Sequence, residues 1–316
     1  MPRIARIVVK GEPAVYHVMS RTALDGFVLE DIEKEYLVEL LKKLSSVYFA
    51  EVLRFCIMGN HFHILVRMHQ DKNYSDDEIR ERYKLYYGEK AHDEGLNSEK
   101  ILQFRRKWAN LSEYVREIKQ GFSWFYNKRH KRKGFFWSGR FKSVIVDNGE
   151  TLINCLAYID LNPVRAGLVD KPENYRWSSI GYHVQTDNKD DFLSLDFGLV
   201  EFSPSGMRET APGEVHGVNN KNINDRLKYY RNFLYRKGNI KYLENEAAKD
   251  FELNRVDRFL HRTRYFTDSG IIGSKVFVGR LYQEFKDYFS SKHEKKPKVI
   301  KGLEGIYSLK RLSEAI

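Results

Sequence analysis

Apolar and polar residues alternate along the first part of the chain, and this alternation predicts strands. Residues 14–20 read Ala-Val-Tyr-His-Val-Met-Ser, residues 51–58 form a second apolar run, and residues 61–68 form a third after the pair Gly59-Asn60. A period of two is typical of strands, and a Gly-Asn pair between two such runs predicts a hairpin. Between the first two strands, apolar residues recur at helical spacing over residues 29–48, which predicts a helix.

Helical spacing returns in residues 111–128 and again in a segment that stops before Pro163, with a short apolar strand at residues 143–147 between them. The polar stretch 70–110 predicts a surface insertion with some helix over residues 77–87. The order strand, helix, strand, strand, helix, strand, helix favours an α+β fold. We expect a ferredoxin-like antiparallel sheet with helices on one face.

The chain divides into three predicted parts. Residues 1–185 form the first domain, residues 186–222 contain many turn formers and read as a linker, and residues 223–316 form a helical C-terminal region. Within that last region we expect helices from residue 223, over residues 254–262, and after Ser274. Two interpretations of this region stay open, namely a small DNA-binding module and a helical brace against the first domain.

Charge narrows the classes of partner. The 316 residues include 54 Lys and Arg against 43 Asp and Glu, which gives a net charge of +11. Such a basic balance favours a polyanionic partner, most often nucleic acid. No apolar run is long enough to span a bilayer, and the first residues do not resemble a signal peptide, so we expect a cytoplasmic protein associated with the nucleoid. The only cysteines, Cys56 and Cys155, cannot form a disulfide framework.

Two histidines flank one apolar residue in the segment His61-Phe62-His63. Residues i and i+2 of a strand point to the same face, so both imidazoles would project together while Phe62 points into a core. Two adjacent imidazoles supply half of a divalent-metal site. The alternative is a strand whose exposed face happens to carry two histidines.

A basic segment rich in aromatic residues spans residues 128–142. Cations attract phosphates, and unpaired bases stack on aromatic rings, so this segment predicts contact with nucleic acid. A solvated loop is the alternative, as is a solvated tail for the basic N-terminal leader. The candidate DNA-binding residues are Arg3, Arg6, Lys128, Arg129, Lys131, Arg132, Lys133, Trp137, Arg140, Lys142 and Arg165.

Tyr158 and Asn162 are four residues apart and share one face near the end of a predicted helix. By themselves, these two residues are also compatible with a buried structural tyrosine and an asparagine that caps the helix end.

Several motifs together resemble a known family. They are Tyr16-His17-Val18, the segment 58–65 (Met-Gly-Asn-His-Phe-His-Ile-Leu), the segment 136–143 (Phe-Trp-Ser-Gly-Arg-Phe-Lys-Ser), the segment 157–167 (Ala-Tyr-Ile-Asp-Leu-Asn-Pro-Val-Arg-Ala-Gly) and Trp177-Ser178-Ser179. In this order and spacing, they resemble the HUH single-tyrosine transposases, and most closely the REP-associated tyrosine transposases. The resemblance spans about residues 1–185, and the insertion at 70–110 departs from it because family members more often have a shorter connection there.

The resemblance implies an activity and a set of roles. His61, His63 and Asn162 would hold Mg²⁺ or Mn²⁺, and Tyr158 would be the nucleophile of a metal-dependent endonuclease and strand transferase. Members of this family act on single-stranded DNA and on hairpins formed by palindromic repeats, through a 5′-phosphotyrosine intermediate. We expect a monomer, with a dimer as the alternative because some relatives exchange the tyrosine helix between subunits.

Three other functions compete with this one. The first is a relative that binds repeat DNA without cutting it, and the second is an RNA-binding protein that uses the basic aromatic segment. A peripheral membrane protein is the third, and would require an amphipathic basic helix. The first rival does not need all four of His61, His63, Tyr158 and Asn162, and the second does not explain the Tyr158 and Asn162 pair.

Overall fold

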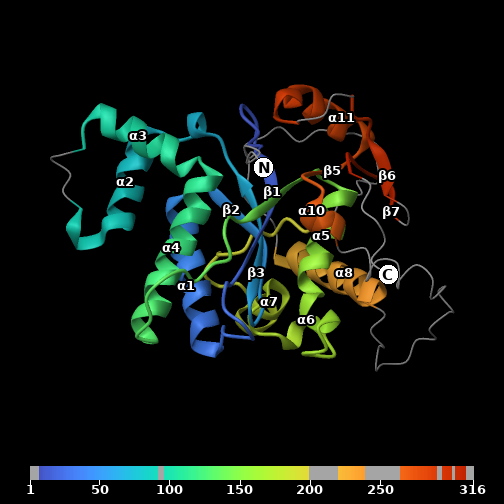
Figure 1. The fold of residues 1–316 in the computed structure, drawn as a ribbon, viewed down its shortest axis with the longest axis horizontal. Helices are drawn as coiled ribbons and strands as arrows, with labels where there is room; N and C mark the ends of the chain where they lie inside the picture. The colour runs from blue at the N-terminus through green and yellow to red at the C-terminus, as the bar shows by residue number, and fades with distance from the viewer. Residues whose placement is uncertain are drawn as a thin grey trace.

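The computed structural model describes residues 7–91, 96–198, 220–238, 264–289, 294–300 and 303–310. A seven-stranded sheet in the order β2-β3-β1-β4-β5-β7-β6 runs through the molecule (Figure 1). Strands β1 to β4 pair antiparallel, β5 joins β4 in parallel, and β7 pairs antiparallel with both β5 and β6. The strands are β1 (Ala14–Arg21), β2 (Ala50–Ile57), β3 (His61–Met68), β4 (Lys142–Val146), β5 (Ile271–Gly273), β6 (Lys298–Ile300) and β7 (Leu303–Ser308).

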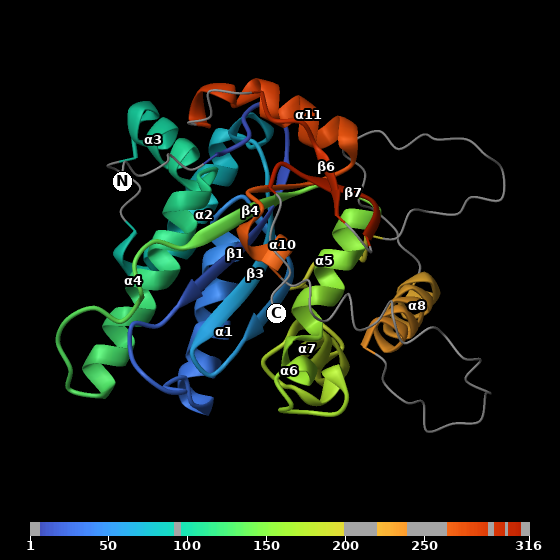
Figure 2. The same ribbon diagram turned by 45° about the vertical axis from the view of Figure 1, so that its right-hand side comes forward.

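The described helices are α1 (Asp31–Val47), α2 (Asp76–Tyr87), α3 (Ser98–Trp108), α4 (Leu111–Arg129), α5 (Glu150–Asp160), α6 (Asn162–Arg165), α7 (Ser179–Thr186), α8 (Asn220–Gly238), α10 (Arg264–Asp268) and α11 (Lys275–Glu284). The predicted α+β class with a ferredoxin-like antiparallel sheet is confirmed. The helices, however, cover both faces of this sheet, because α1 and α4 lie on one face and α5 on the other (Figure 2). Leu65 and Val144 explain this difference, since they make the second face apolar too and it needs its own cover.

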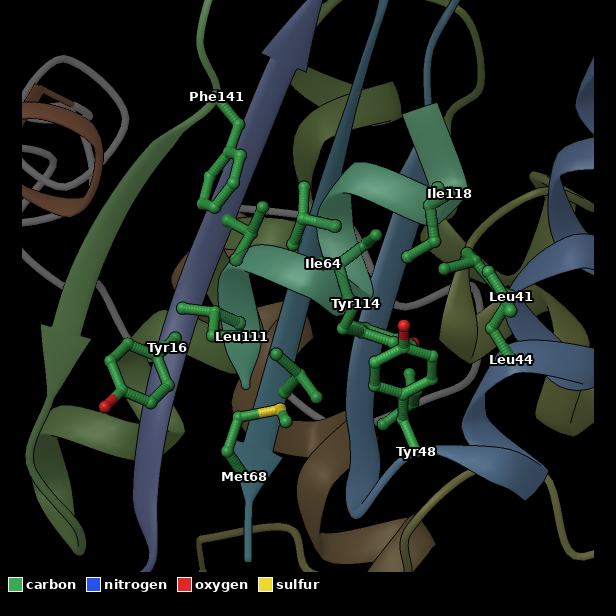
Figure 3. Close-up of a cluster of buried hydrophobic side chains, with 14 of the residues drawn as sticks. Tyr16, Leu41, Leu44, Tyr48, Ile64, Met68, Leu111, Tyr114, Ile118 and Phe141 are labelled. Atoms are coloured by element: carbon green, nitrogen blue, oxygen red, sulfur yellow. The ribbon is translucent and has the colours of Figure 1, made fainter. Parts of the chain in front are cut away.

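The core of the first face forms where the strands meet α1 and α4 (Figure 3). Tyr16 and Ile64 from the strands lie among Leu41 of α1 and Tyr114 and Ile118 of α4, and all five are buried. The alternation predicted for β3 is therefore confirmed. Phe62, Ile64 and Val66 face this core, and the residues between them face the other side of the sheet. This leaves His61 and His63 on the second face.

The insertion between β3 and α4 contributes residues to the core and does not lie only on the surface. Helix α2 lies where helix was expected, but α3 was not predicted, and Ile79, Ile101 and Trp108 from these helices are buried in the core of the first face. The Phe49 amide donates to the Trp108 carbonyl at 3.0 Å, which fixes the end of α3 beside the start of β2. Basic residues within α3 obscured its apolar stripe, so the sequence alone suggested only a polar segment.

The C-terminal region is not purely helical, contrary to expectation. Helices α8 and α11 occur where predicted, and the Ser274 hydroxyl caps α11 by accepting from the Phe277 amide at 3.2 Å. Strands β5, β6 and β7 from the same region extend the sheet, and two of them are too short to show a period of two. The predicted helix at 254–262 and most of the predicted linker lie outside the described residues, and the domain boundaries stay a prediction.

Helix α8 is attached to the first domain through buried charge. The Tyr230 hydroxyl donates to Asp160 Oδ2 at 2.7 Å, and Arg54 Nε lies 3.2 Å from the same oxygen. Both charged side chains are fully buried, so removing either would leave an uncompensated charge in the interior. This cluster holds the end of α5 against β2 and α8. No helix among the described residues is both long and apolar enough to cross a membrane.

Candidate active site

Side chains from β1, β3 and α5 converge on the second face of the sheet. The ring centroid of Tyr158 lies 5.8 Å from that of His63 and 5.7 Å from that of His17. The rings of His61 and His63 are 5.1 Å apart. The predicted neighbourhood of the histidine pair and the tyrosine helix is therefore present, with His17 as an additional member.

A chain of hydrogen bonds determines how these histidines are oriented. His17 Nδ1 lies 2.7 Å from the Phe266 carbonyl oxygen, and His17 Nε2 lies 2.9 Å from His63 Nδ1. A carbonyl can only accept, so a neutral His17 carries its proton on Nδ1 and accepts at Nε2. His63 must then donate from Nδ1, which leaves its Nε2 as the nitrogen with a free electron pair. At His61, Nδ1 lies 2.7 Å from the Asn60 side-chain oxygen, and the same reasoning leaves Nε2 free.

Burial keeps these imidazoles neutral. It lowers the pKa of His17 to about 4 and places that of His63 well below its ordinary value. Burial also lowers the pKa of His61 to about 4, and the nearby charge of Arg21 acts in the same direction. Neutral imidazoles are the form that binds metals, so the pair is prepared to act as ligands at neutral pH.

Tyr158 lies deep within the site, with only 4% of its surface exposed. The ring of Phe266, from α10, stacks against it with centroids 5.0 Å apart. Burial raises the pKa of the Tyr158 phenol to about 12, while the charge of Arg165 acts in the opposite direction. Among the residues that the structure describes, none forms a hydrogen bond with the Tyr158 hydroxyl, so no side chain contacts it as a base.

Asn162 begins α6, directly after the tyrosine helix ends. Arg165 Nη2 donates to the Asn162 side-chain oxygen at 2.6 Å and to the Tyr158 carbonyl at 2.8 Å. The guanidinium also lies over the Tyr158 ring, 4.3 Å from its centroid. Arg165 was predicted as a DNA contact, and the structure places it half-buried inside the site. The Asn162 amide nitrogen is buried and has no partner among the described residues.

The predicted basic segment is divided between internal contacts and solvent. Arg129 donates to Glu33 at 3.1 Å, Arg132 donates to Asn127 at 3.2 Å, and Lys142 lies 2.7 Å from a carboxylate oxygen of Asp268. Other members of the segment are exposed, namely Lys128, Lys131, Lys133 and Arg140. Arg3 and Arg6 lie outside the described residues.

Trp137 is not placed to stack on a base, although the sequence suggested this role. Trp137 is only 7% exposed as a residue, and its Nε1 donates to the Lys119 carbonyl at 2.8 Å, so it attaches the loop to α4. The exposed aromatic residues nearby are Phe135 and Trp124 instead. Neither was distinguished by sequence, because period and composition do not reveal which of several successive aromatic residues is buried.

Sequence reasoning also gave no role to His17 or Phe266. His17 belongs to the Tyr16-His17-Val18 motif, which was the one available signal. Phe266 contributes a backbone carbonyl across 249 positions of sequence, and no side-chain pattern can reveal such a contact.

Comparison with known proteins agrees with the motifs. Residues 12–110 match the family described as Transposase IS200 like. A Haemophilus influenzae protein, provisionally named as a REP-associated tyrosine transposase, is 26% identical over 168 residues, which cover 51% of this chain and 80% of that protein. A solved structure of a REP-associated tyrosine transposase bound to a REP hairpin is 17% identical, covers 67% of this chain and all of that one, and has a TM-score of 0.41. Over residues 12–110 the chain is thus similar to IS200-like transposases, and over about half of its length it is similar to the Haemophilus influenzae protein.

Proposed function

We propose that the protein is a metal-dependent endonuclease and strand transferase that cuts single-stranded DNA near repeat hairpins through Tyr158. One observation carries this proposal, namely that two neutral histidines of β3 and a tyrosine of α5 meet on one sheet face. The family relationship supports DNA processing in general. We propose that it acts as a monomer, in the cytoplasm at the nucleoid.

The residues present fit a divalent cation. His61 and His63 each engage Nδ1 with a neighbour and keep Nε2 available, which is the usual arrangement of a metal-binding histidine. The Asn162 oxygen accepts from Arg165 but retains a second lone pair. Within the described residues, no group of three histidine, cysteine or carboxylate side chains is placed to hold a metal, so the site would depend on this amide. We propose Mg²⁺ or Mn²⁺, which both accept such ligands and open positions.

The bound cation would polarise the scissile phosphate and stabilise charge on the departing oxygen. Tyr158 Oη attacks phosphorus, the bond from phosphorus to O3′ breaks, and the tyrosine keeps the 5′ phosphate as a phosphodiester. The phenol loses its proton and the departing O3′ gains one, so the step is balanced. Arg165 lies over the ring and favours the phenolate, which offsets part of the cost of burial. Because the link conserves phosphodiester energy, a 3′-hydroxyl can reverse the step and rejoin strands.

A denaturing gel tests the proposal. Purified protein is mixed with labelled hairpin DNA from the repeats that flank its own gene, with Mg²⁺ or Mn²⁺. We expect a covalent protein–DNA band that disappears in Tyr158→Phe, whereas native gels show unchanged binding. Tyr36→Phe is the matched control, because Tyr36 packs against Phe125 on the opposite face of the sheet.

Cutting by Tyr158→Phe would identify another nucleophile and contradict the proposal. Binding without any covalent band in the wild type would favour the binding protein derived from a transposase, and preferential binding of RNA would favour the RNA-binding alternative.

A further inference from the structure

A groove of about 1120 Å³ lies between α4 and the loop that precedes β4. Its lining is mostly apolar and comes from two segments that face each other. One side is formed by residues of α4, namely Ser112, Glu113, Arg116, Lys119, Gln120 and Ser123. The other side is formed by residues 134–141 of the loop, and Ala23 also lines the groove. No residue assigned above to metal binding or to the nucleophile lines it, so it is a separate feature of the surface.

Phe135 is the most unusual member of this lining. The residue is 90% exposed, although the next residues along the loop, Phe136 and Trp137, are buried. The loop is held firmly, because Trp137 Nε1 donates to the Lys119 carbonyl and Lys119 Nζ donates to the Gly139 carbonyl at 2.7 Å. A fixed loop therefore presents a bare aromatic ring to solvent, which forgoes the ~2 kcal/mol that burying a phenylalanine side chain provides.

The groove is bordered by positive charge. Arg116, Lys119 and Arg140 all line it, against a single carboxylate, Glu113, which pairs with Arg116. Arg140 is exposed and has no ion-pair partner within the part of the chain that the structure describes. An occupant that combines a flat apolar group with a negative charge matches this lining.

The loop that lines the groove is hydrogen-bonded to the end of β1 and to the residues that follow it. The Ser138 amide donates to the Arg21 carbonyl at 2.8 Å, and the Ala23 amide donates to the Phe136 carbonyl at 2.7 Å. Arg21 is the residue of β1 that lies opposite His61 of β3. The loop that carries Phe135 is thus attached to the strand end at which the histidine pair starts, while the groove itself lies on the α4 side of the sheet.

We propose that this groove binds one unpaired nucleobase of the substrate DNA, with Phe135 stacked on the base and Arg140 near the flanking phosphate. This inference rests on the proposed function, because it supplies that reaction with a site for single-stranded substrate. The base must be unpaired, since the faces of bases in a duplex are already occupied by their neighbours. Stacking recognises any base, so the groove selects for strand state rather than for sequence.

The test combines protein variants with modified DNA. Full-length wild type, Phe135→Ala and Phe135→Trp are titrated, in the presence of EDTA, with a fluorescent hairpin that has a single-stranded flank. The same titration is repeated with one abasic site moved along that flank. We expect Phe135→Ala to weaken binding about 5- to 150-fold and Phe135→Trp to restore it. When the abasic site replaces the base that stacks on Phe135, the DNA affinity of wild type should fall by a similar factor. The affinity of Phe135→Ala should not change at that position.

Trp124→Ala is the matched control, because Trp124 is an exposed aromatic residue of α4 outside the groove lining. Its effect should be the same at every abasic position. The inference is overturned if Phe135→Ala binds DNA as tightly as wild type. It is also overturned if the ratio between the affinities of wild type and Phe135→Ala is the same at every abasic position. It is also overturned if Phe135→Ala changes only self-association in sedimentation, because the occupant would then be protein. Covalent product from Tyr158 on the same DNA shows separately whether the proposed function holds.

Discussion

The two faces of the central sheet differ in kind although the same strands build both. The face beneath α1 and α4 is a continuous apolar core, whereas the face beneath α5 buries His17, His63 and Asp160 with Arg54. A strand alternates its side chains, so β1 and β3 contribute apolar residues to the first face and place buried histidines beside apolar residues such as Leu65 on the second. The comparison indicates that substitutions at adjacent positions of β3 should have quite different consequences.

The largest effect is expected from His63→Ala on the face with buried polar groups. If His63 is the metal ligand that we propose, its loss should lower metal-dependent cleavage by at least about 100-fold, because stabilisation of transition-state charge by a metal is worth several kcal/mol. Thermal unfolding should move little by comparison, and single-turnover cleavage with Mn²⁺ is the measurement. Undiminished cleavage by wild type in EDTA would refute the metal requirement itself.

The neighbouring substitution Ile64→Ala should reverse this pattern. Ile64 is 1% exposed in the core of the first face, and its truncation should lower the free energy of unfolding by about 2–5 kcal/mol. Urea denaturation measures the loss, and cleavage per folded molecule should stay close to wild type at low temperature. A selective loss of cleavage with unchanged stability would mean that the two faces are not separable in this way.

A smaller effect, about 10- to 100-fold in metal affinity, is expected for His17→Gln, because residues that orient a metal ligand contribute on that scale. Calorimetric titration with Mn²⁺ measures it without any DNA. The nitrogen shifts of His63 should also show loss of the single tautomer that the Phe266 carbonyl imposes through His17. Met19→Leu is the control, since Met19 follows His17 on the same face of β1. Equal Mn²⁺ affinity in wild type, His17→Gln and Met19→Leu would show that His17 does not orient the proposed metal ligand.

Acid should weaken the protein through the same buried histidine. In the unfolded chain His17 takes up a proton near pH 6.5, whereas in the folded protein burial lowers its pKa to about 4. Its contribution is therefore complete above pH 6.5 and is lost as the pH falls towards 4, by about 1.4 kcal/mol per pH unit. Urea midpoints measured in EDTA should fall across this window, and less steeply in His17→Gln. Parallel curves for the two proteins would contradict the assignment.

The smallest effect concerns the exposed cations outside both faces. Lys131→Asn with Lys133→Gln should reduce the slope of log affinity against log salt by about 1.4, because each phosphate contact on single strands contributes about 0.7. Fluorescence anisotropy with a single-stranded oligonucleotide gives the slope. Replacing Lys90 and Lys189, two exposed lysines of other segments, supplies the control. An unchanged slope would mean that Lys131 and Lys133 do not contact DNA phosphates.

Local patterns predicted much of the molecule but not its long-range contacts. The alternation around His61 and the apolar spacing before Tyr158 gave the hairpin and the helix, because each depends on neighbouring residues. Coverage of both sheet faces could not be inferred, since Leu65 and Phe62 look equally apolar in sequence. The contact between His17 and Phe266 and the parallel pairing of β4 with β5 join segments more than 100 residues apart, and neither has a periodic signature.

The bond from His17 to the Phe266 carbonyl has a consequence for how the protein matures during synthesis. A nascent chain that has emerged only as far as α7 already contains both histidines of β3 and the tyrosine of α5, yet lacks the carbonyl that orients them. Domains fold as the chain leaves the ribosome, so the residues of the proposed active site would come together before His17 is oriented. If the proposed function holds, we expect the ability to cut DNA to arise only after Phe266 has been synthesised, so shorter nascent chains should not cut.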